Sequence, residues 1–287
     1  MTPGPIHTIE FAAALGDWQL RSAPPAPDLA GAVLEYWEVH GTLRPFRETL
    51  LPNGAVEIMV NLGPVHEVHS DQGRGRWTHA WISGLHERAL TIESLDGTHL
   101  VSARLHPLGA VELLGDHVAT LANRIVPIEA ILGAESLALR IELLAAASPA
   151  ERFAILERFV RDVRARTGRT VPEFLRRATS TIDAMHGNVR TSELHEDVGV
   201  SRRHLSVTFS RHVGLSAKRY SAIRRFMWTL AQLRGQAAVD WSRLAADAGY
   251  SDQSHLARDF RRIGAATPTE YLRRATPAAD ALIDEAR

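Results

Sequence analysis

Hydrophobic and polar positions alternate in short runs between Ala32 and His106, and turn-forming residues separate the runs. Alternation with a period of two places every second side chain on one face, as in a half-buried β-strand. Asn53-Gly54 predicts a tight hairpin turn in the same region. We therefore expect a small antiparallel sheet or β-barrel, with strands at 32–40, 55–62, 91–95 and 99–106.

From about Val111 the apolar spacing changes to three and four residues, the period of a helix with one buried face. Ser148 can cap a helix, Pro149 suits its first position, and Glu151 completes a capping box. Two helical runs are predicted, with apolar positions at Leu137, Ile141 and Leu144 and then at Phe153, Leu156, Val160 and Val163.

The break at 167–172 divides the chain into an N-terminal domain at 1–168, with helices from about 111, and a C-terminal domain at 171–275. The net charge of zero conceals opposite charges in these parts. Residues 171–275 contain 17 Lys and Arg against 10 Asp and Glu, whereas residues 1–170 contain 15 against 20. A basic domain beside an acidic one indicates nucleic-acid binding.

Several classes of protein are disfavoured by what the sequence lacks. There is no cysteine, which excludes disulfides, thiolate metal sites and cysteine nucleophiles. No apolar run approaches the roughly 20 residues of a membrane span, and the start lacks the order of a signal peptide, so we expect a cytoplasmic protein without membrane contact. Phosphate-binding loops and nucleophile-elbow motifs are missing, so we expect neither an enzyme nor a cofactor.

An internal repeat carries most of the information in the C-terminal domain. LHEDVGVS at 194–201 and LAADAGYS at 244–251 share Leu, Asp, Gly and Ser at the same offsets, 50 residues apart. The leucine fits the buried face of a short helix, the glycine ends that helix, and the serine caps a second helix. Each unit predicts a helix-turn-helix. The positions are Leu194, Gly199 and Ser201 in the first unit and Leu244, Gly249 and Ser251 in the second.

The second helix of each unit has a predicted buried face and a face that can meet DNA. Arginine pairs with guanine, glutamine with adenine, and small apolar side chains contact the thymine methyl group. A solvated helical face is the alternative for one unit alone, but two units in a basic segment favour base reading. The buried positions are Leu205 and Phe209, then Leu256, Phe260 and Ile263; the outward positions are Arg202, Arg203, Ser206, Val207 and Arg211, then Gln253, Ser254, Ala257, Arg258 and Arg261.

An amphipathic stretch at 216–234 joins the two units, with Tyr220, Ile223, Met227, Leu230 and Leu233 on one side. Its 19 residues would make about 28 Å of helix, close to the ~34 Å repeat of the duplex. Residues 181–274 resemble the DNA-binding domain of the AraC/XylS family of bacterial transcription regulators. The strings that carry the resemblance are GVSRRHLSVTFSRHVGLS at 199–216, GYSDQSHLARDFRR at 249–262 and TPTEYLRR at 267–274.

The resemblance implies an all-α, DNA-binding regulator whose base-reading residues are Arg203, Ser206, Val207, Gln253, Ser254, Ala257 and Arg258. The expected phosphate contacts are Arg202, Arg211, Arg219, Arg261 and Arg262. The chain departs from the family pattern at Thr229 and Gln232 in the connector, at Val207, where arginine is common, and near the end, where the glycine is displaced to Gly264 and Ala265 takes its place.

The N-terminal part is similar to uncharacterised sensor-like domains that precede such DNA-binding units in actinobacteria, through YWEVHG, FRETLLPNGAVEIMVNLG and ARLHPLGAVELLG. This resemblance implies a cupin-like β-domain that senses a small molecule, with helices that form a homodimer, and RNA polymerase as a partner if the protein is an activator. An enzymatic β-domain and a non-sensing architectural DNA-binding protein are the alternatives.

Candidate pocket residues combine tryptophans with charged and amide groups, which would suit an anionic or aromatic effector. They are Trp37, Arg47, Asn53, Glu57, Trp81, Arg104 and His106. The alternative is that the tryptophans belong to the core and that each arginine pairs with a carboxylate, Glu57 or Glu48. Histidines at 66, 69, 79, 86 and 106 could hold a metal ion, but a cupin His-x-His with a following Glu is absent, so we expect no metal site.

Overall fold

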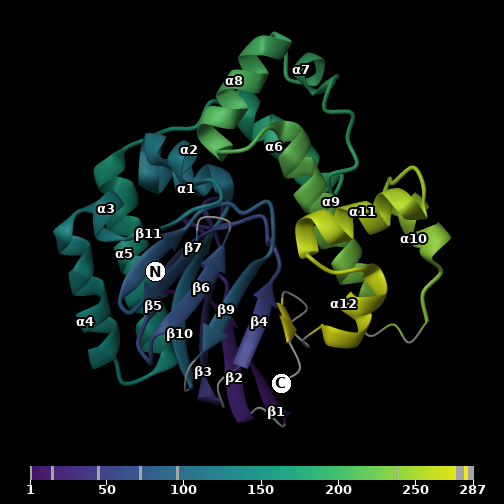
Figure 1. The fold of residues 1–287 in the computed structure, drawn as a ribbon. Helices are drawn as coiled ribbons and strands as arrows, with labels where there is room; N and C mark the ends of the chain where they lie inside the picture. Colours follow the sequence, from purple (N-terminus) through teal and green to yellow (C-terminus); the bar gives the residue numbers. More distant parts are fainter. Residues whose placement is uncertain are drawn as a thin grey trace.

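A computed structural model of the chain describes residues 2–13, 16–43, 46–70, 73–94, 97–234, 236, 238–275 and 281–283. These residues form two antiparallel sheets, helices that cover one of them, and a helical C-terminal part (Figure 1). The α+β class is confirmed. None of the helices in these ranges is long and apolar enough to cross a membrane.

The larger sheet has seven antiparallel strands in the order β1-β2-β3-β10-β5-β8-β11. Their bounds are His7–Ala13 (β1), Gly16–Ala23 (β2), Val33–Leu43 (β3), Thr98–Leu105 (β10), Val56–Asn61 (β5), Ala80–Ser83 (β8) and Ile125–Pro127 (β11). The strands predicted at 32–40, 55–62 and 99–106 are confirmed as β3, β5 and β10. Every residue of β5 is buried, because this strand lies inside the sheet with both faces covered.

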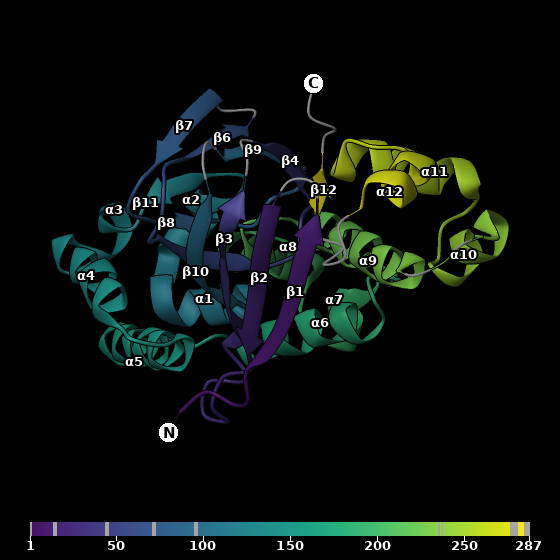
Figure 2. The same ribbon diagram turned by 90° about the horizontal axis from the view of Figure 1, so that it is seen from below.

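The smaller sheet has five strands in the order β12-β4-β9-β6-β7, also antiparallel. Their bounds are Ala281–Ile283 (β12), Phe46–Leu50 (β4), Leu90–Ser94 (β9), His66–Ser70 (β6) and Gly73–Trp77 (β7). β12 returns from the far end of the chain to pair with β4 (Figure 2). In the described residues neither sheet closes on itself, so the predicted sheet is confirmed and the alternative of a barrel is wrong.

The hairpin predicted at Asn53-Gly54 is also wrong, because this turn joins β4 and β5, which belong to different sheets. Asn53 Oδ1 accepts a hydrogen bond from the N–H of Ala55 at 3.1 Å, and its amide donates to Glu57 at 2.6 Å. Gly54 has a φ of +68°, and a Cβ there would lie 2.9 Å from Met227 Sδ. Local hydrogen bonds of Asn53 and the packing of Gly54 against Met227, rather than a partner strand, hold the turn.

Helices α1 and α5 cover one face of the larger sheet (Figure 1). The bounds of the helical elements before Gly168 are Pro107–Leu114 (α1), Gly115–His117 (η1, a 3₁₀ turn), Val118–Leu121 (α2), Glu129–Leu132 (α3), Ala134–Leu137 (η2), Ala138–Ala145 (α4) and Pro149–Thr167 (α5). As predicted, Ser148 caps α5 and accepts from the N–H of Glu151. The Glu151 carboxylate accepts from Ala147 N, one residue earlier than in a capping box.

The two helical runs predicted from the sequence face in different directions. Phe153, Leu156, Val160 and Val163 of α5 are all buried. In contrast, α4 buries Leu139 and Leu143, while Leu137, Ile141 and Leu144 are 39%, 70% and 50% exposed. The apolar stripe identified in the sequence of this helix therefore faces solvent.

The C-terminal part is helical and shares its core with the N-terminal part. Its helices are Glu173–Ala184 (α6), Leu194–Asp197 (α7), Arg202–Val213 (α8), Ala217–Leu233 (α9), Trp241–Asp247 (α10), Gln253–Gly264 (α11) and Pro268–Arg274 (α12). One buried cluster runs from the larger sheet through α5 into α6, α8 and α9, and a second lies around α9, α11 and α12. The predicted boundary at Gly168, a left-handed residue that ends α5, thus separates helices that share one core.

Candidate nucleic-acid interface

The first predicted unit is a helix-turn-helix formed by α7 and α8. Gly199 between them has a φ of +73°, which favours glycine, and Ser201 caps α8 by accepting from the N–H of His204 at 3.2 Å. Leu205 and Phe209 are buried as expected. These contacts fix the direction in which α8 leaves the turn.

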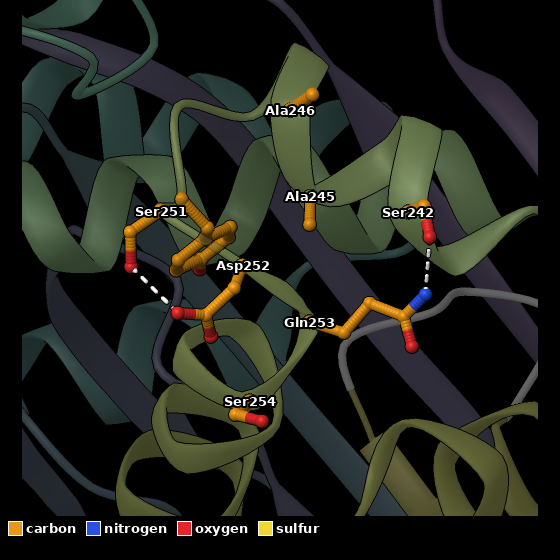
Figure 3. A pocket seen from close by; sticks show the side chains of 8 residues that line it. Ser242, Ala245, Ala246, Ser251, Asp252, Gln253 and Ser254 are labelled. Atoms are coloured by element: carbon orange, nitrogen blue, oxygen red, sulfur yellow. Dashed lines mark hydrogen bonds between the residues drawn. The ribbon is translucent and has the colours of Figure 1, made fainter.

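The second unit is formed by α10 and α11 and differs from the prediction at its cap. Asp252, not Ser251, caps α11 and accepts from the N–H of His255 at 2.7 Å. This hydrogen bond holds the pKa of Asp252 below the ordinary value of an aspartate. Ser251 instead donates to Asp252, as Figure 3 shows. The turn inserts one residue more than the repeat suggested, so the helix begins at Gln253.

The predicted reading residues lie on the outward faces of α8 and α11. Val207 is 61% exposed, and Ala257 is the one member that is half-buried. Gln253 donates a hydrogen bond to Ser242 of α10, across a hollow of about 450 Å³ (Figure 3). The exposed members are Arg203, Ser206, Val207, Gln253, Ser254 and Arg258.

Helix α9 packs against both units, because its residues belong to the buried clusters of each. Tyr220, near the start of α9, contacts Phe209 of the first unit, with ring centroids 6.0 Å apart and the ring planes tilted by 53°. Arg225 donates to the carbonyl of Gly249 at 2.9 Å and lies over the Tyr250 ring, so it holds the turn of the second unit. The connector predicted at 216–234 is confirmed, with Ser216 as its cap and seventeen helical residues that span about 26 Å.

Two of the departures from the family pattern, at Thr229 and at Gly264 with Ala265, have structural reasons. Thr229 is fully buried, and its hydroxyl donates to the carbonyl of Arg225 at 2.8 Å within α9. A Cβ at Gly264 would lie 2.8 Å from the Phe226 ring, so the glycine is needed for close packing. Ala265 then occupies the left-handed position that ends α11, with a φ of +52°.

The arginines expected to contact phosphate differ in whether they form ion pairs within the protein. Arg202 and Arg261 are exposed, and Arg262 pairs with Asp259 of its own helix at 2.8 Å. Arg211 pairs with Asp116 at 3.2 Å, and Arg219 pairs with Glu87 at 3.2 Å. Both carboxylates belong to the N-terminal part. Periodicity and local motifs carried no signal for this pairing, since both acids lie in loops or short turns.

The structure brings together four of the candidate pocket residues. Arg104 Nε donates to Glu57 at 2.8 Å, and Asn53 donates to the same carboxylate. The Arg104 guanidinium also pairs with Glu35 and lies 6.0 Å from the centre of a Trp37 ring. The pairing with Glu57 is the alternative that the sequence had left open.

The other three candidates lie elsewhere. Trp81 is 3% exposed and packs against Trp77, with ring centroids 5.7 Å apart and the ring planes tilted by 46°. Arg47 is on the smaller sheet, 3.9 Å from Glu93. His106 caps α1, and its Nε2 lies 3.0 Å from Asp183 of α6. Asp183 also accepts from the Tyr220 hydroxyl at 2.8 Å, so it joins the two parts of the chain; no sequence pattern had marked it.

Comparisons with known proteins follow the same division of the chain. The sequence model of a helix-turn-helix domain family matches residues 194–274, and that of a domain of unknown function, DUF6597, matches residues 21–127. No curated protein sequence matches.

Three solved structures have partly similar folds. ToxT from Vibrio cholerae has 11% identity over 83% of this chain and 97% of its own, with a TM-score of 0.48. The AraC-like transcriptional activator CuxR has 15% identity over 79% of this chain and 87% of its own, with a TM-score of 0.34. An oxalate decarboxylase of Bacillus subtilis has 16% identity over only 34% of this chain and 27% of its own, with a TM-score of 0.25.

The family matches and the geometry of the two helix-turn-helix units agree with each other. The matched residues 194–274 include both units and α9, and the DUF6597 match includes most strands of both sheets. The chain is therefore a DNA-binding transcription regulator with an AraC-type helix-turn-helix domain behind a DUF6597 domain.

Proposed function

We propose that the protein reads a specific operator with α8 and α11, responds to a small-molecule effector through its N-terminal sheets, and acts as a homodimer. The observation that carries the proposal is the pair of exposed recognition helices, each capped and oriented by its own turn and joined by the anchored helix α9. Such a pair can enter successive major grooves on one face of the duplex. A regulator is favoured over an enzyme because each helix-turn-helix unit has its turn, its capped second helix and an exposed face on that helix.

Base reading is tested with Arg258→Ala and Gln253→Ala on an operator recovered by selection from random duplexes. Each variant is expected to lose about 1–3 kcal/mol on the operator and little on random DNA, because the lost contacts read bases. Arg261→Ala, on the same helix, is the matched control and should weaken binding to all DNA alike. Equal losses on both DNAs for Arg258→Ala and Gln253→Ala would instead support an architectural protein without sequence preference.

The proposed effector site lies between the two sheets, at an apolar cluster. Met59, Trp81 and Leu100 form a small buried cluster with Trp37 and Trp77, separate from the main core. Arg104 and Glu57 lie beside it, and they can exchange their mutual pairing for polar groups of a ligand. A thermal-shift screen of metabolites tests this: a ligand that stabilises the wild type should lose its effect in Trp37→Ala, whereas Leu34→Ala, on the same strand, should keep it.

The proposed dimer uses the exposed stripe of Leu137, which immediately precedes α4, and Ile141 and Leu144 of α4, because these side chains lie at the spacing of one helix face. A second copy of the same helix would bury them symmetrically. Ile141→Glu is expected to yield monomers in sedimentation at micromolar concentration. Leu34→Glu changes an exposed leucine of β3 and is the control. A monomeric wild type would contradict the proposal.

A further inference from the structure

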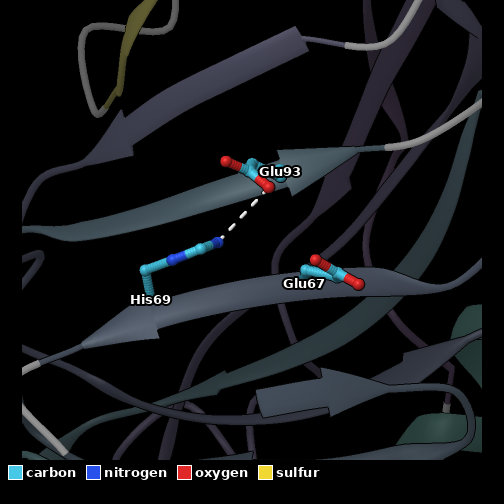
Figure 4. Close-up of side chains that lie close together, drawn as sticks. All are labelled: Glu67, His69 and Glu93. Atoms are coloured by element: carbon cyan, nitrogen blue, oxygen red, sulfur yellow. Dashed lines mark ion pairs between the residues drawn. The ribbon is translucent and has the colours of Figure 1, made fainter. Parts of the chain in front are cut away.

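Three potential metal ligands meet on one face of the smaller sheet: Glu67 and His69 of β6 and Glu93 of β9. One ligand atom from each lies within 4.8 Å of the other two. Glu67 is directly opposite Glu93 in the strand register, and His69 follows two residues later on the same face (Figure 4). The opposite face of the sheet, which includes Trp77, packs on the larger sheet. The three residues come from two strands, so no local motif announces them.

The two carboxylates need a cation because like charges directly opposite on neighbouring strands repel each other. Arg74 of the edge strand β7 currently supplies it: its guanidinium contacts Glu67 and lies 3.8 Å from Glu93. Arg76 lies 3.4 Å from the Glu67 carboxylate, and Arg47 lies 3.9 Å from that of Glu93. All three arginine side chains are more than half exposed, so each ion pair contributes only about 0–1 kcal/mol and can be displaced.

The third ligand is the independent sign of a metal. His69 Nε2 is shielded from solvent, makes no hydrogen bond among the described residues, and points at Glu93 Oε2 from 3.4 Å. A shielded nitrogen without a hydrogen bond is costly, and a metal ion between it and the carboxylates would satisfy it. Glu67, 6% exposed, places a buried carboxylate beside it. One imidazole with two carboxylates suits Zn²⁺, Fe²⁺, Mn²⁺ or Ni²⁺ rather than Mg²⁺ or Ca²⁺.

We propose that Glu67, His69 and Glu93 bind a divalent transition-metal ion in the place of the Arg74 guanidinium, with water in the remaining positions. The ion would link β6 to β9, two central strands of the sheet that also receives β12. This site lies on the opposite side of the sheet from the proposed effector space, so it stands or falls independently of that proposal.

The experiment is calorimetric titration of Zn²⁺ into the full-length protein after treatment with a chelator. The wild type should bind one ion, and Mg²⁺ should give no heat. His69→Gln and Glu93→Gln should each weaken Zn²⁺ binding at least about tenfold, while His79→Gln, an exposed histidine on the turn after β7, should leave it unchanged.

Arg74→Gln separates a metal site from an ordinary salt-bridge cluster. If Arg74 competes with the ion, its removal should tighten Zn²⁺ binding severalfold, and melting curves without metal will show whether each variant is folded. The proposal is overturned if the wild type does not bind Zn²⁺ at about 100 µM, which is about ten times a Kd of about 10 µM. It is also overturned if His79→Gln weakens Zn²⁺ binding as much as His69→Gln, or if Arg74→Gln weakens it.

Discussion

Replacing Arg104 by alanine tests whether this residue is a structural partner or a ligand anchor. The side chain is 20% exposed and pairs with Glu57, whose side chain is 9% exposed. Removing one partner of a buried ion pair costs about 3–5 kcal/mol, because the other charge is left without compensation. Glu57 would keep hydrogen bonds from Asn53 at 2.6 Å and Ser102 at 3.2 Å, and water can reach the vacated space. We therefore expect a smaller loss, of about 2 kcal/mol.

A loss of this size lowers the melting temperature of a chain this long by about 4–8 °C, measured without any ligand. The double variant Arg104→Ala with Glu57→Gln removes the uncompensated charge and should recover part of the loss. Arg47→Ala is the control, since Arg47 lies on the exposed side of the smaller sheet, and it should change the melting temperature by less than about 2 °C. If Arg104→Ala melts at the wild-type temperature, the pairing with Glu57 does not stabilise the fold.

Three further predictions follow from contacts elsewhere in the molecule. Asp116→Asn should strengthen DNA binding by up to about 5-fold in anisotropy titrations, because it releases Arg211 from an exposed pair worth about 0.2–1 kcal/mol. Asp162→Asn, an equal charge change on α5, is the control, and an equal effect would contradict the reasoning. Ala265→Gly should raise the free energy of unfolding by up to about 1 kcal/mol, because φ is +52° there; a lower value would show that the methyl group packs better than it strains. Burial lowers the pKa of His66 to about 4, against about 6.5 in the unfolded chain. The fold with a neutral His66 is therefore fully stable above pH 6.5 and loses stability as the pH falls from 6.5 toward 4. His66→Gln should flatten the profile of melting temperature against pH in that range, and an unchanged profile would argue against it.

The fold of the helix-turn-helix domain could be predicted almost entirely from the sequence, because its signals are local. The repeat at 194–201 and 244–251 fixed both turns, and the apolar spacing fixed which faces of α8 and α11 are buried. The one local error was the cap of α11: Ser251 and Asp252 are adjacent acceptors, and only the backbone path of the turn selected Asp252.

The N-terminal part was predictable only in outline, because alternation marks a strand but not its partner. The pattern identified β3, β5, β9 and β10 but placed them in one sheet. The residues of the Asn53-Gly54 turn carry no signal that this turn connects two different sheets. Strands such as β7, which is rich in glycine and arginine, have no apolar alternation at all. Strand pairing depends on contacts between residues far apart in sequence.

The sequence by itself indicated the class of the protein through its resemblance to a known family. It also determined the two helix-turn-helix units, the connector and the outward faces of α8 and α11, since these follow from periodicity and capping within a few turns of chain. Only the tertiary structure decided that Asp116 and Glu87 hold two of the expected phosphate contacts, that Arg104 pairs with Glu57, and that the stripe on α4 faces solvent. The physical reason is that periodicity records which face of an element is apolar or charged, whereas the group that meets this face is set by long-range packing.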